Sequence, residues 1–390
     1  MFLSIALILI FGLLTSYLCK KIKLPGLIGM LLTGIILGPF CFNLLNDNLL
    51  NISGEIRKIA LVIILTRAGL TLDLSGLKKI GRPAILMCFV PASFELLGIL
   101  ILGPKLLGIS LLEAALIGAV LSAVSPAIVV PRMVDMIEKK HGTNQGIPQL
   151  ILAGASVDDI YVIVLFSTFL NMTQGKEISG MSFVNIPISI VLGIIIGLLV
   201  GCLLSKLFHY ISMSTTVKVL IMLSASLLLV SMEDMLTTTI TFSALIAIMF
   251  IGIGLQKWKN DDVQMISSQY NKLWIGAEVF LFVLVGASVN ISYLGNVGAK
   301  AFILIIFALA FRMLGVLTCL IKTDFKWKER FFTMLAYTPK ATVQAAIGGI
   351  PLSLGLACGN TVLTIAVLAI VFTAPLGAFA IDISKDKLVK

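Results

Sequence analysis

Two adjacent carboxylates lie in the middle of a strongly apolar stretch of the chain. Asp158 comes about eleven residues into the apolar segment 147–170, and at about 1.5 Å per helical residue this depth is about 16 Å, near the midplane of a bilayer. Hard cations such as sodium and lithium prefer oxygen ligands. Burial disfavours the charged form of a carboxylate, so protons compete for the same oxygens. Asp158 and Asp159 therefore predict a site at which a monovalent cation and a proton exchange.

Two serines are candidates to complete this site. Ser156 precedes Asp159 by three residues and lies close to the same face of the predicted helix. Ser125 lies at a proline-marked break in another apolar segment, where freed main-chain carbonyls could also face the cation. Successive helical residues point about 100° apart, so one aspartate can hold the cation while its neighbour pairs with a lysine. A purely structural salt-bridge network of both aspartates with Lys340 and Arg312 stays open as an alternative.

Three further charges reach a similar depth: Glu95, Arg312 and Lys340. Ionisable residues inside a membrane are costly, and they usually face a partner or an ion path. We expect Glu95 and Arg312 to form a pair whose role is mainly structural. Three roles are open to Lys340: it compensates carbonyl ends at a helix break, it pairs with Asp158, or it releases a proton when the cation enters.

The chain contains an internal repeat. The segments 94–100 (FELLGIL) and 311–317 (FRMLGVL) match at a spacing of 217 residues, and 67–77 matches 284–294 at the same spacing. The repeat shifts the pattern by seven predicted membrane spans, and an odd shift reverses the direction of the chain through the membrane. We therefore predict two inverted repeats, in which Glu95 occupies the position equivalent to Arg312.

Matching interruptions occur in the two repeats. The first contains SPA at 125–127, with Pro126, and the second contains TPKAT at 338–342, with Thr338 and Pro339. Proline removes a backbone donor and disfavours helix in the residue before it. Two symmetry-related interruptions predict discontinuous helices that cross, and the freed ends of such half-helices commonly form ion sites.

The composition indicates an all-α polytopic membrane protein. Of the 390 residues 59% are hydrophobic and only 12% are charged, whereas soluble domains carry about a quarter charged residues. Helices are expected because lipid offers no hydrogen-bond partner to the backbone. About thirteen spans are long enough to cross. They cover residues 2–19, 25–45, 58–74, 83–103, 111–131, 147–170, 183–205, 216–232, 238–255, 272–290, 299–320, 331–351 and 360–381.

The net charge of +10 is a topology signal rather than a nucleic-acid footprint. Most Lys and Arg residues lie in loops on one side of the predicted spans. This bias places the N-terminus outside and the C-terminus on the cytoplasmic side of a cell (plasma or inner) membrane.

The repeat divides the chain into three parts. The first repeat is 1–182, the connecting span is 183–215 and the second repeat is 216–390, with ion-binding core helices within 83–171 and 299–381.

The chain resembles the cation:proton antiporters over essentially its full length. AGASVDDIYVIVLF at 153–166 is similar to the Asp-Asp motif of that superfamily, SAVSPAIVVP at 122–131 to its first crossing helix, and TPKATVQAAIG at 338–348 to the NHA-type sodium/proton exchanger branch. The resemblance implies thirteen helices, a six-helix core, a dimerisation domain interleaved with it in sequence, and a homodimer in lipid. It also implies that Asp159 binds the cation and the proton, that Asp158 assists, and that the core moves as an elevator. No cofactor is implied.

The sequence departs from both common patterns of that superfamily. Electroneutral exchangers usually have Asn at the position of Asp158, and electrogenic bacterial relatives have Lys at the position of Arg312, so neither pattern assigns the stoichiometry.

Sodium/proton or lithium/proton antiport is the expected function. Potassium/proton antiport is an alternative, and a sodium-coupled organic anion symporter is a less favoured one, because it would not need vicinal aspartates. No nucleotide-binding loop or nucleophile constellation indicates an enzyme.

Overall fold

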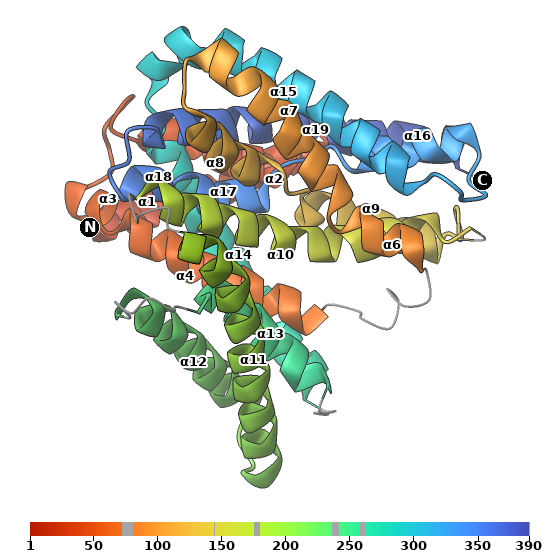
Figure 1. The fold of residues 1–390 in the computed structure, drawn as a ribbon. Helices are drawn as coiled ribbons and strands as arrows, with labels where there is room; N and C mark the ends of the chain where they lie inside the picture. The colour runs from red at the N-terminus through yellow and green to blue at the C-terminus, as the bar shows by residue number, and fades with distance from the viewer. Residues whose placement is uncertain (72–80, 144, 175–179, 236–241, 258–261, 390) are drawn as a thin grey trace. The chain divides into compact units, whose positions relative to one another are not determined.

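A computed structural model describes residues 1–71, 81–143, 145–174, 180–235, 242–257 and 262–389. Every regular element among these residues is a helix (Figure 1). The helices are α1 (Phe2–Lys21), α2 (Gly26–Leu37), α3 (Asp47–Asn51), α4 (Ser53–Thr71), α6 (Arg82–Met87), α7 (Val90–Leu107), α8 (Leu111–Leu121), α9 (Pro126–Glu138), α10 (Ile147–Thr173), α11 (Gly180–Tyr210), α12 (Thr215–Met235), α13 (Ala244–Lys257), α14 (Val263–Ala287), α15 (Ile291–Cys319), α16 (Trp327–Ala336), α17 (Thr342–Gly348), α18 (Ile350–Ser353) and α19 (Gly359–Leu388).

Nine segments within the described residues are long and apolar enough to cross a membrane. Two shorter apolar helices, α2 and α13, lie where spans 25–45 and 238–255 are predicted, although the first residues of the second span fall outside the described ranges. The predicted span 331–351 is divided among three short helices in the structure. The chain is therefore a multi-pass membrane protein, and the number of thirteen spans stays a prediction.

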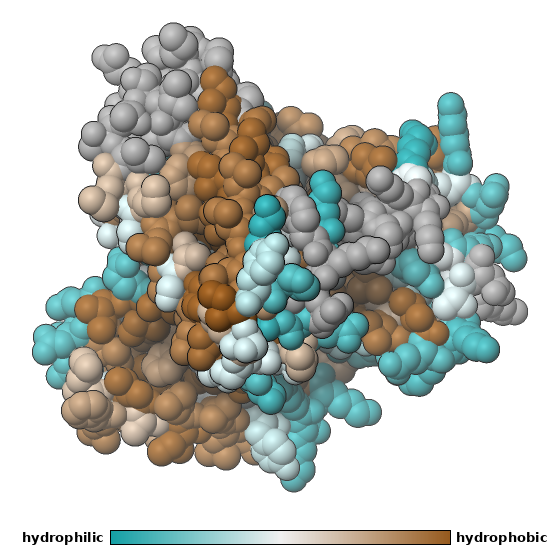
Figure 2. Space-filling model, turned by 90° about the horizontal axis from the view of Figure 1, so that it is seen from below, coloured by the Kyte–Doolittle hydropathy of each residue, from teal (hydrophilic) through white to brown (hydrophobic). Residues whose placement is uncertain are grey.

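Large apolar side chains lie on the outside of the molecule. Figure 2 shows wide hydrophobic areas on one face. On α1, Phe2 is 85% exposed and Leu3 is 70% exposed. In water such a surface would be costly, but in a bilayer these side chains face lipid tails, which are as apolar as they are.

The chain forms two compact units. One contains Met1–Gly54, Asp73–Thr173 and Leu281–Lys390, and the other contains Glu55–Leu72 and Gln174–Phe280. Every residue that the sequence marks as a site candidate lies in the first of these units.

Two helices of the first unit are interrupted at the places that the prolines mark. Helix α8 ends at Leu121 and α9 begins at Pro126. Helix α16 ends at Ala336 and α17 begins at Thr342, so 337–341 is also outside any helix. The two non-helical stretches meet, because the Ser125 amide donates to the carbonyl of Pro339 at 2.8 Å. This bond pairs two backbone groups that a helix would otherwise satisfy.

Helices α7 and α15 pack along each other (Figure 1) through two reciprocal contacts. A Cβ built on Gly98 would lie 2.9 Å from Cγ of Phe311, and one on Gly315 would lie 3.0 Å from Cβ of Phe94. Each glycine therefore accommodates the phenylalanine of the other helix. The same exchange of roles is expected when two equivalent surfaces meet across a two-fold axis.

Two further helix pairs approach backbone to backbone, one in each unit. In the first unit, Gly34 of α2 lies against the Val283 carbonyl of α14, and Gly286 of α14 lies against α2. In the second unit, Gly69 of α4 and Gly252 of α13 are in direct contact. Small residues at such crossings allow membrane helices to pack closely.

Candidate ion-binding site

Helix α10 carries both aspartates of the predicted site into the interior of the first unit. It packs against α6, α8, α9 and α16. The exposed fraction is 0% for Asp158 and 8% for Asp159. Both carboxylates are therefore removed from solvent, and each needs a compensating partner, proton or cation.

Asp158 is held by two donors. Its Oδ2 accepts from Nη2 of Arg312 at 2.9 Å and from the Val124 amide at 2.8 Å. The Val124 amide belongs to the stretch between α8 and α9, where the interrupted helix leaves it without a helical acceptor. Asp158 thus fixes the first non-helical stretch to α10 as well as pairing with a base.

Arg312 lies at the centre of the network. Its guanidinium is fully buried, and Nη1 donates to Oε2 of Glu95 at 2.8 Å. Nη1 also donates to the Ser122 carbonyl, and Nε donates to the Tyr337 carbonyl at 2.7 Å. A guanidinium offers five N–H donors in a planar fork, which suits it to join two acids and both non-helical stretches at once.

Lys340 pairs with Glu95 and not with Asp158, which differs from one role that the sequence left open to it. Its Nζ donates to Oε2 of Glu95 at 2.6 Å. Its own amide donates to Oγ1 of Thr373 on α19 at 2.9 Å, and this bond fixes the backbone that carries the lysine. Because Arg312 bonds to both acids, Asp158 already has a base, and Glu95 is the acid that Lys340 reaches.

Asp159 has a different environment from its neighbour. Its Oδ1 is buried and has no hydrogen-bond partner among the described residues. Several other buried side-chain oxygens near the two non-helical stretches also have no partner within that part of the chain. They include Asp158 Oδ1, Ser125 Oγ, Thr342 Oγ1, Gln344 Oε1 and Tyr337 Oη.

The carbonyl end of α8 is occupied by side chains. The Gln344 carboxamide donates to the carbonyls of Leu121 at 3.2 Å and Ala123 at 2.9 Å, and Arg312 donates to the carbonyl between them. The sequence led us to expect that freed carbonyls complete the cation shell. In the structure, these three carbonyls already accept hydrogen bonds from side chains. Sequence reasoning did not select Thr342, Gln344 or Thr373, because uncharged polar residues are common in membrane helices.

The remaining candidates have clear positions. The Pro339 ring lies against Gly377 of α19, where a Cβ would overlap it. Pro126 is the first residue of α9, a position at which proline loses no helical bond. Thr338 Oγ1 donates to the Leu335 carbonyl at 2.8 Å. The side chain of Ser156 lies outside the described part of the structure.

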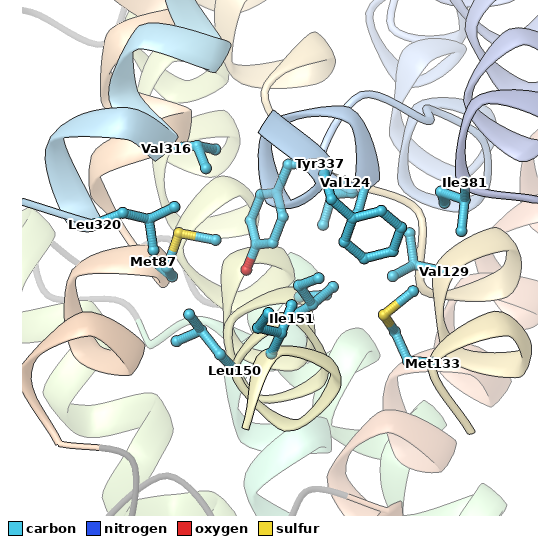
Figure 3. Close-up of a cluster of buried hydrophobic side chains, with 14 of the residues drawn as sticks. Met87, Val124, Val129, Met133, Leu150, Ile151, Val316, Leu320, Tyr337 and Ile381 are labelled. Carbon is cyan, nitrogen blue, oxygen red and sulfur yellow. The ribbon is translucent and has the colours of Figure 1, made fainter. Parts of the chain in front are cut away.

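A cluster of buried hydrophobic side chains (Figure 3) includes Tyr337, whose carbonyl accepts from Arg312 of the charge network. Tyr337, from the second non-helical stretch, packs among Met87, Val316 and Ile151. Its hydroxyl approaches the backbone of α10 so closely that a Cβ at Gly154 would overlap it. This packing fixes the position of the second stretch relative to α10 and keeps water away from one side of the network.

Comparison with known proteins identifies the family. The family model for the transmembrane sodium/hydrogen exchanger matches residues 5–383. The chain belongs to the sodium/hydrogen exchanger family. Among curated relatives, sodium/hydrogen exchanger 9B2 of Xenopus tropicalis is 31% identical, and the match covers 96% of this exchanger and 72% of that relative. Sodium/hydrogen exchanger 9B1 of Homo sapiens is also 31% identical, and the match covers 94% of this exchanger and 73% of that relative.

A solved structure has the same fold. The sodium proton antiporter MjNhaP1 from Methanocaldococcus jannaschii, at pH 8, superposes with a TM-score of 0.86 over 98% of this exchanger and 97% of that chain, with 23% identity. The family assignment confirms that the chain is a member of the cation:proton antiporter superfamily and a membrane transporter. Cation/proton antiport is therefore its general activity.

Proposed function

We propose that this exchanger transports Na⁺ or Li⁺ against H⁺ by alternating access, with Asp159 as the shared ligand of the cation and the proton. The observation that carries this proposal is the contrast within α10. Asp158 is bonded to a base and an amide, whereas the buried Oδ1 of Asp159 has no partner within the described residues. A buried carboxylate without a partner is costly unless it binds a proton or a cation.

The charges at the crossing support a one-for-one exchange. Three buried carboxylates, Glu95, Asp158 and Asp159, face two buried bases, Arg312 and Lys340. With all five ionised, the group carries one excess negative charge, which one monovalent cation or one proton neutralises. Lys340 remains bonded to Glu95, so it does not need to release a proton when the cation arrives. We therefore propose electroneutral transport.

The proposed cation is small. Carboxylate and hydroxyl oxygens are the unpartnered oxygens at the crossing, together with one carboxamide oxygen. Small hard cations favour such charged oxygen ligands. Asp159, Asp158, Ser125 and Ser156 are the proposed ligands of Na⁺ or Li⁺, and Thr342 is an additional one.

The proposed architecture comprises thirteen helices in two inverted six-helix repeats. Reciprocal contacts support it: Gly98 with Phe311 becomes Gly315 with Phe94 when each residue is replaced by its repeat equivalent. The two non-helical stretches, one from each repeat, also meet at Ser125 and Pro339. The first repeat then covers 1–182, the connecting span 183–215 and the second repeat 216–390.

The core helices within 83–171 and 299–381 are proposed to move as an elevator against a dimerisation domain in a homodimer. The division of the chain into two units, each assembled from separate sequence segments, supports such an interleaved arrangement. The proposed location is the plasma or inner membrane, with the N-terminus outside and the basic loops in the cytoplasm.

Proteoliposomes that contain a pH-sensitive dye test the function. Addition of Na⁺ or Li⁺ should dissipate an imposed pH gradient for the wild type and not for Asp159→Asn, which keeps the size of the side chain and removes its charge. The matched control is Asp47→Asn, at an exposed acid on α3, which should transport normally. Full activity of the Asp159 variant would reject the site.

Stoichiometry is tested in the same vesicles. For one-for-one exchange, the initial rate should not change when the membrane potential is clamped with potassium and valinomycin. If more than one proton moves per cation, transport creates a membrane potential that slows it, and the clamp then raises the rate. Such a rise would contradict the proposal that Lys340 keeps its proton.

A further inference from the structure

The end of α8 has the features of a cation site, but its carbonyls are already occupied. The last carbonyls of a helix have no helical donor and carry the negative end of the helix dipole. Such ends coordinate Na⁺ in several membrane transporters with broken helices. Here three consecutive carbonyls, those of Leu121, Ser122 and Ala123, each accept a bond from a side chain of another helix.

Gln344 supplies two of these bonds. Its side chain is completely buried, and both N–H groups of its carboxamide are used, one for Leu121 and one for Ala123. The two carbonyl acceptors fix which side of the amide is nitrogen, since an oxygen there would face two oxygens. The Oε1 atom therefore points away from α8, and it has no partner among the described residues.

We propose that Gln344 is a specificity-determining positioning residue, whose carboxamide masks the carbonyl end of α8 so that the cation is held by carboxylate and hydroxyl oxygens. This inference rests on the function proposed above. Arrays of neutral carbonyl oxygens are the ligands that potassium-selective sites use, whereas a carboxylate oxygen carries a larger charge and favours a smaller cation. Masking the carbonyls therefore favours Na⁺ and Li⁺ over K⁺.

The same bonds position the first non-helical stretch. Leu121 and Ala123 precede Val124, whose amide donates to Asp158, and Ser125, whose amide donates to the second stretch. Loss of Gln344 would thus loosen this stretch as well as unmask the carbonyls. A purely structural role lowers the maximal rate for every cation alike, whereas masking changes the ratio of their KM values.

The test uses Gln344→Met, which has nearly the same volume and no donor, in the proteoliposome assay with Li⁺, Na⁺ and K⁺. The expected result is a fall of at least about threefold in the ratio of the KM for K⁺ to the KM for Na⁺. An unchanged ratio, with or without a lower maximal rate, would overturn the inference. If Gln344→Met does not yield folded protein, Gln344→Leu decides in the same way, since its side chain is also uncharged and has no donor for the carbonyls.

Two controls separate this inference from the proposed function. Thr373→Val removes a buried bond to the Lys340 amide without touching α8, so its KM ratio should remain that of the wild type. A change of the ratio in this control equal to that of Gln344→Met would also overturn the masking role. If Asp159→Asn still transports, the proposed function fails. If Asp159→Asn is inactive but the Gln344 variants keep the wild-type ratio, only the masking role fails.

Discussion

The two halves of the chain contribute opposite charges to the buried network. The first half supplies the acids Glu95, Asp158 and Asp159, and the second half supplies the bases Arg312 and Lys340. Glu95 and Arg312 stand at matching positions of the internal repeat, yet one is an acid and the other a base. In the proposed repeated architecture, the two copies have matching geometry, while the sequence differences between them provide the opposite charges that attract each other and the single excess charge.

The two non-helical stretches differ in a related way. The stretch after α8 has its carbonyls and one amide bonded by side chains from α10, α15 and α17. The stretch after α16 contributes a base of its own, Lys340, and it is bonded by the Thr373 hydroxyl and by Arg312. Other helices thus supply every side chain that bonds the backbone of the first stretch in this set, whereas the second stretch also supplies a charged side chain to the network.

The largest effect is expected when Arg312, the central base of the network, is removed. Arg312→Ala leaves Glu95 with one base and Asp158 with none, and it removes the donors to both non-helical stretches. We expect a loss of about 3–5 kcal/mol in the free energy of unfolding, as for other buried pairs that lose one partner. Thermal unfolding in detergent measures it. A variant as stable as the wild type would show that the network is not structural.

A double-mutant cycle tests whether the halves attract each other through Lys340. Glu95→Gln leaves the buried ammonium without its acid and should cost about 3 kcal/mol. Lys340→Met costs less, because Glu95 keeps Arg312. The double variant should lose less free energy of unfolding than the sum of the losses in the two single variants, by about 1–3 kcal/mol. Simple additivity would mean that the 2.6 Å contact contributes no coupling.

Thr373→Val isolates the support of the second stretch. The side chains have nearly the same shape, and the change leaves the buried Lys340 amide without an acceptor. We expect a loss of about 1–3 kcal/mol, the penalty for an unsatisfied buried donor. Hydrogen exchange of the amides in 338–341 should accelerate relative to that of α10. Unchanged exchange would indicate that another group replaces the hydroxyl.

The smallest effect is expected at the exposed end of the same helices. Arg132 of α9 forms a two-pronged pair with Asp382 of α19, but the side chain of Asp382 is 45% exposed. Asp382→Asn should cost about 0–1 kcal/mol, the usual range for a surface pair. The same melting experiment serves as the baseline for Arg312→Ala. A loss comparable to that of Arg312→Ala would remove the distinction between buried and exposed pairs.

Patterns in the sequence predict the helical class, the helix interruptions and the depth of the charges, because hydropathy, proline and residue spacing act locally. The partner of Lys340 could not be predicted, since it depends on how α19 orients the stretch through Thr373. Gln344 was also missed, because an uncharged amide gives no anomaly in composition, and its role exists only once α8 and α17 meet. Within the described residues, the predicted span 331–351 consists of three short helices, a division that local hydropathy averages over.

The paired glycine contacts have a consequence for biosynthesis. Gly34 of α2 lies against α14, and Gly69 of α4 lies against α13, so two helices made early in translation each have a close neighbour that is made much later. Because the ribosome delivers the chain from its N-terminus, these narrow helix faces remain uncovered while the middle of the chain is still being inserted. These two backbone-to-backbone contacts can therefore form only after α13 and α14 have been inserted, whereas α2 can already pack against α1.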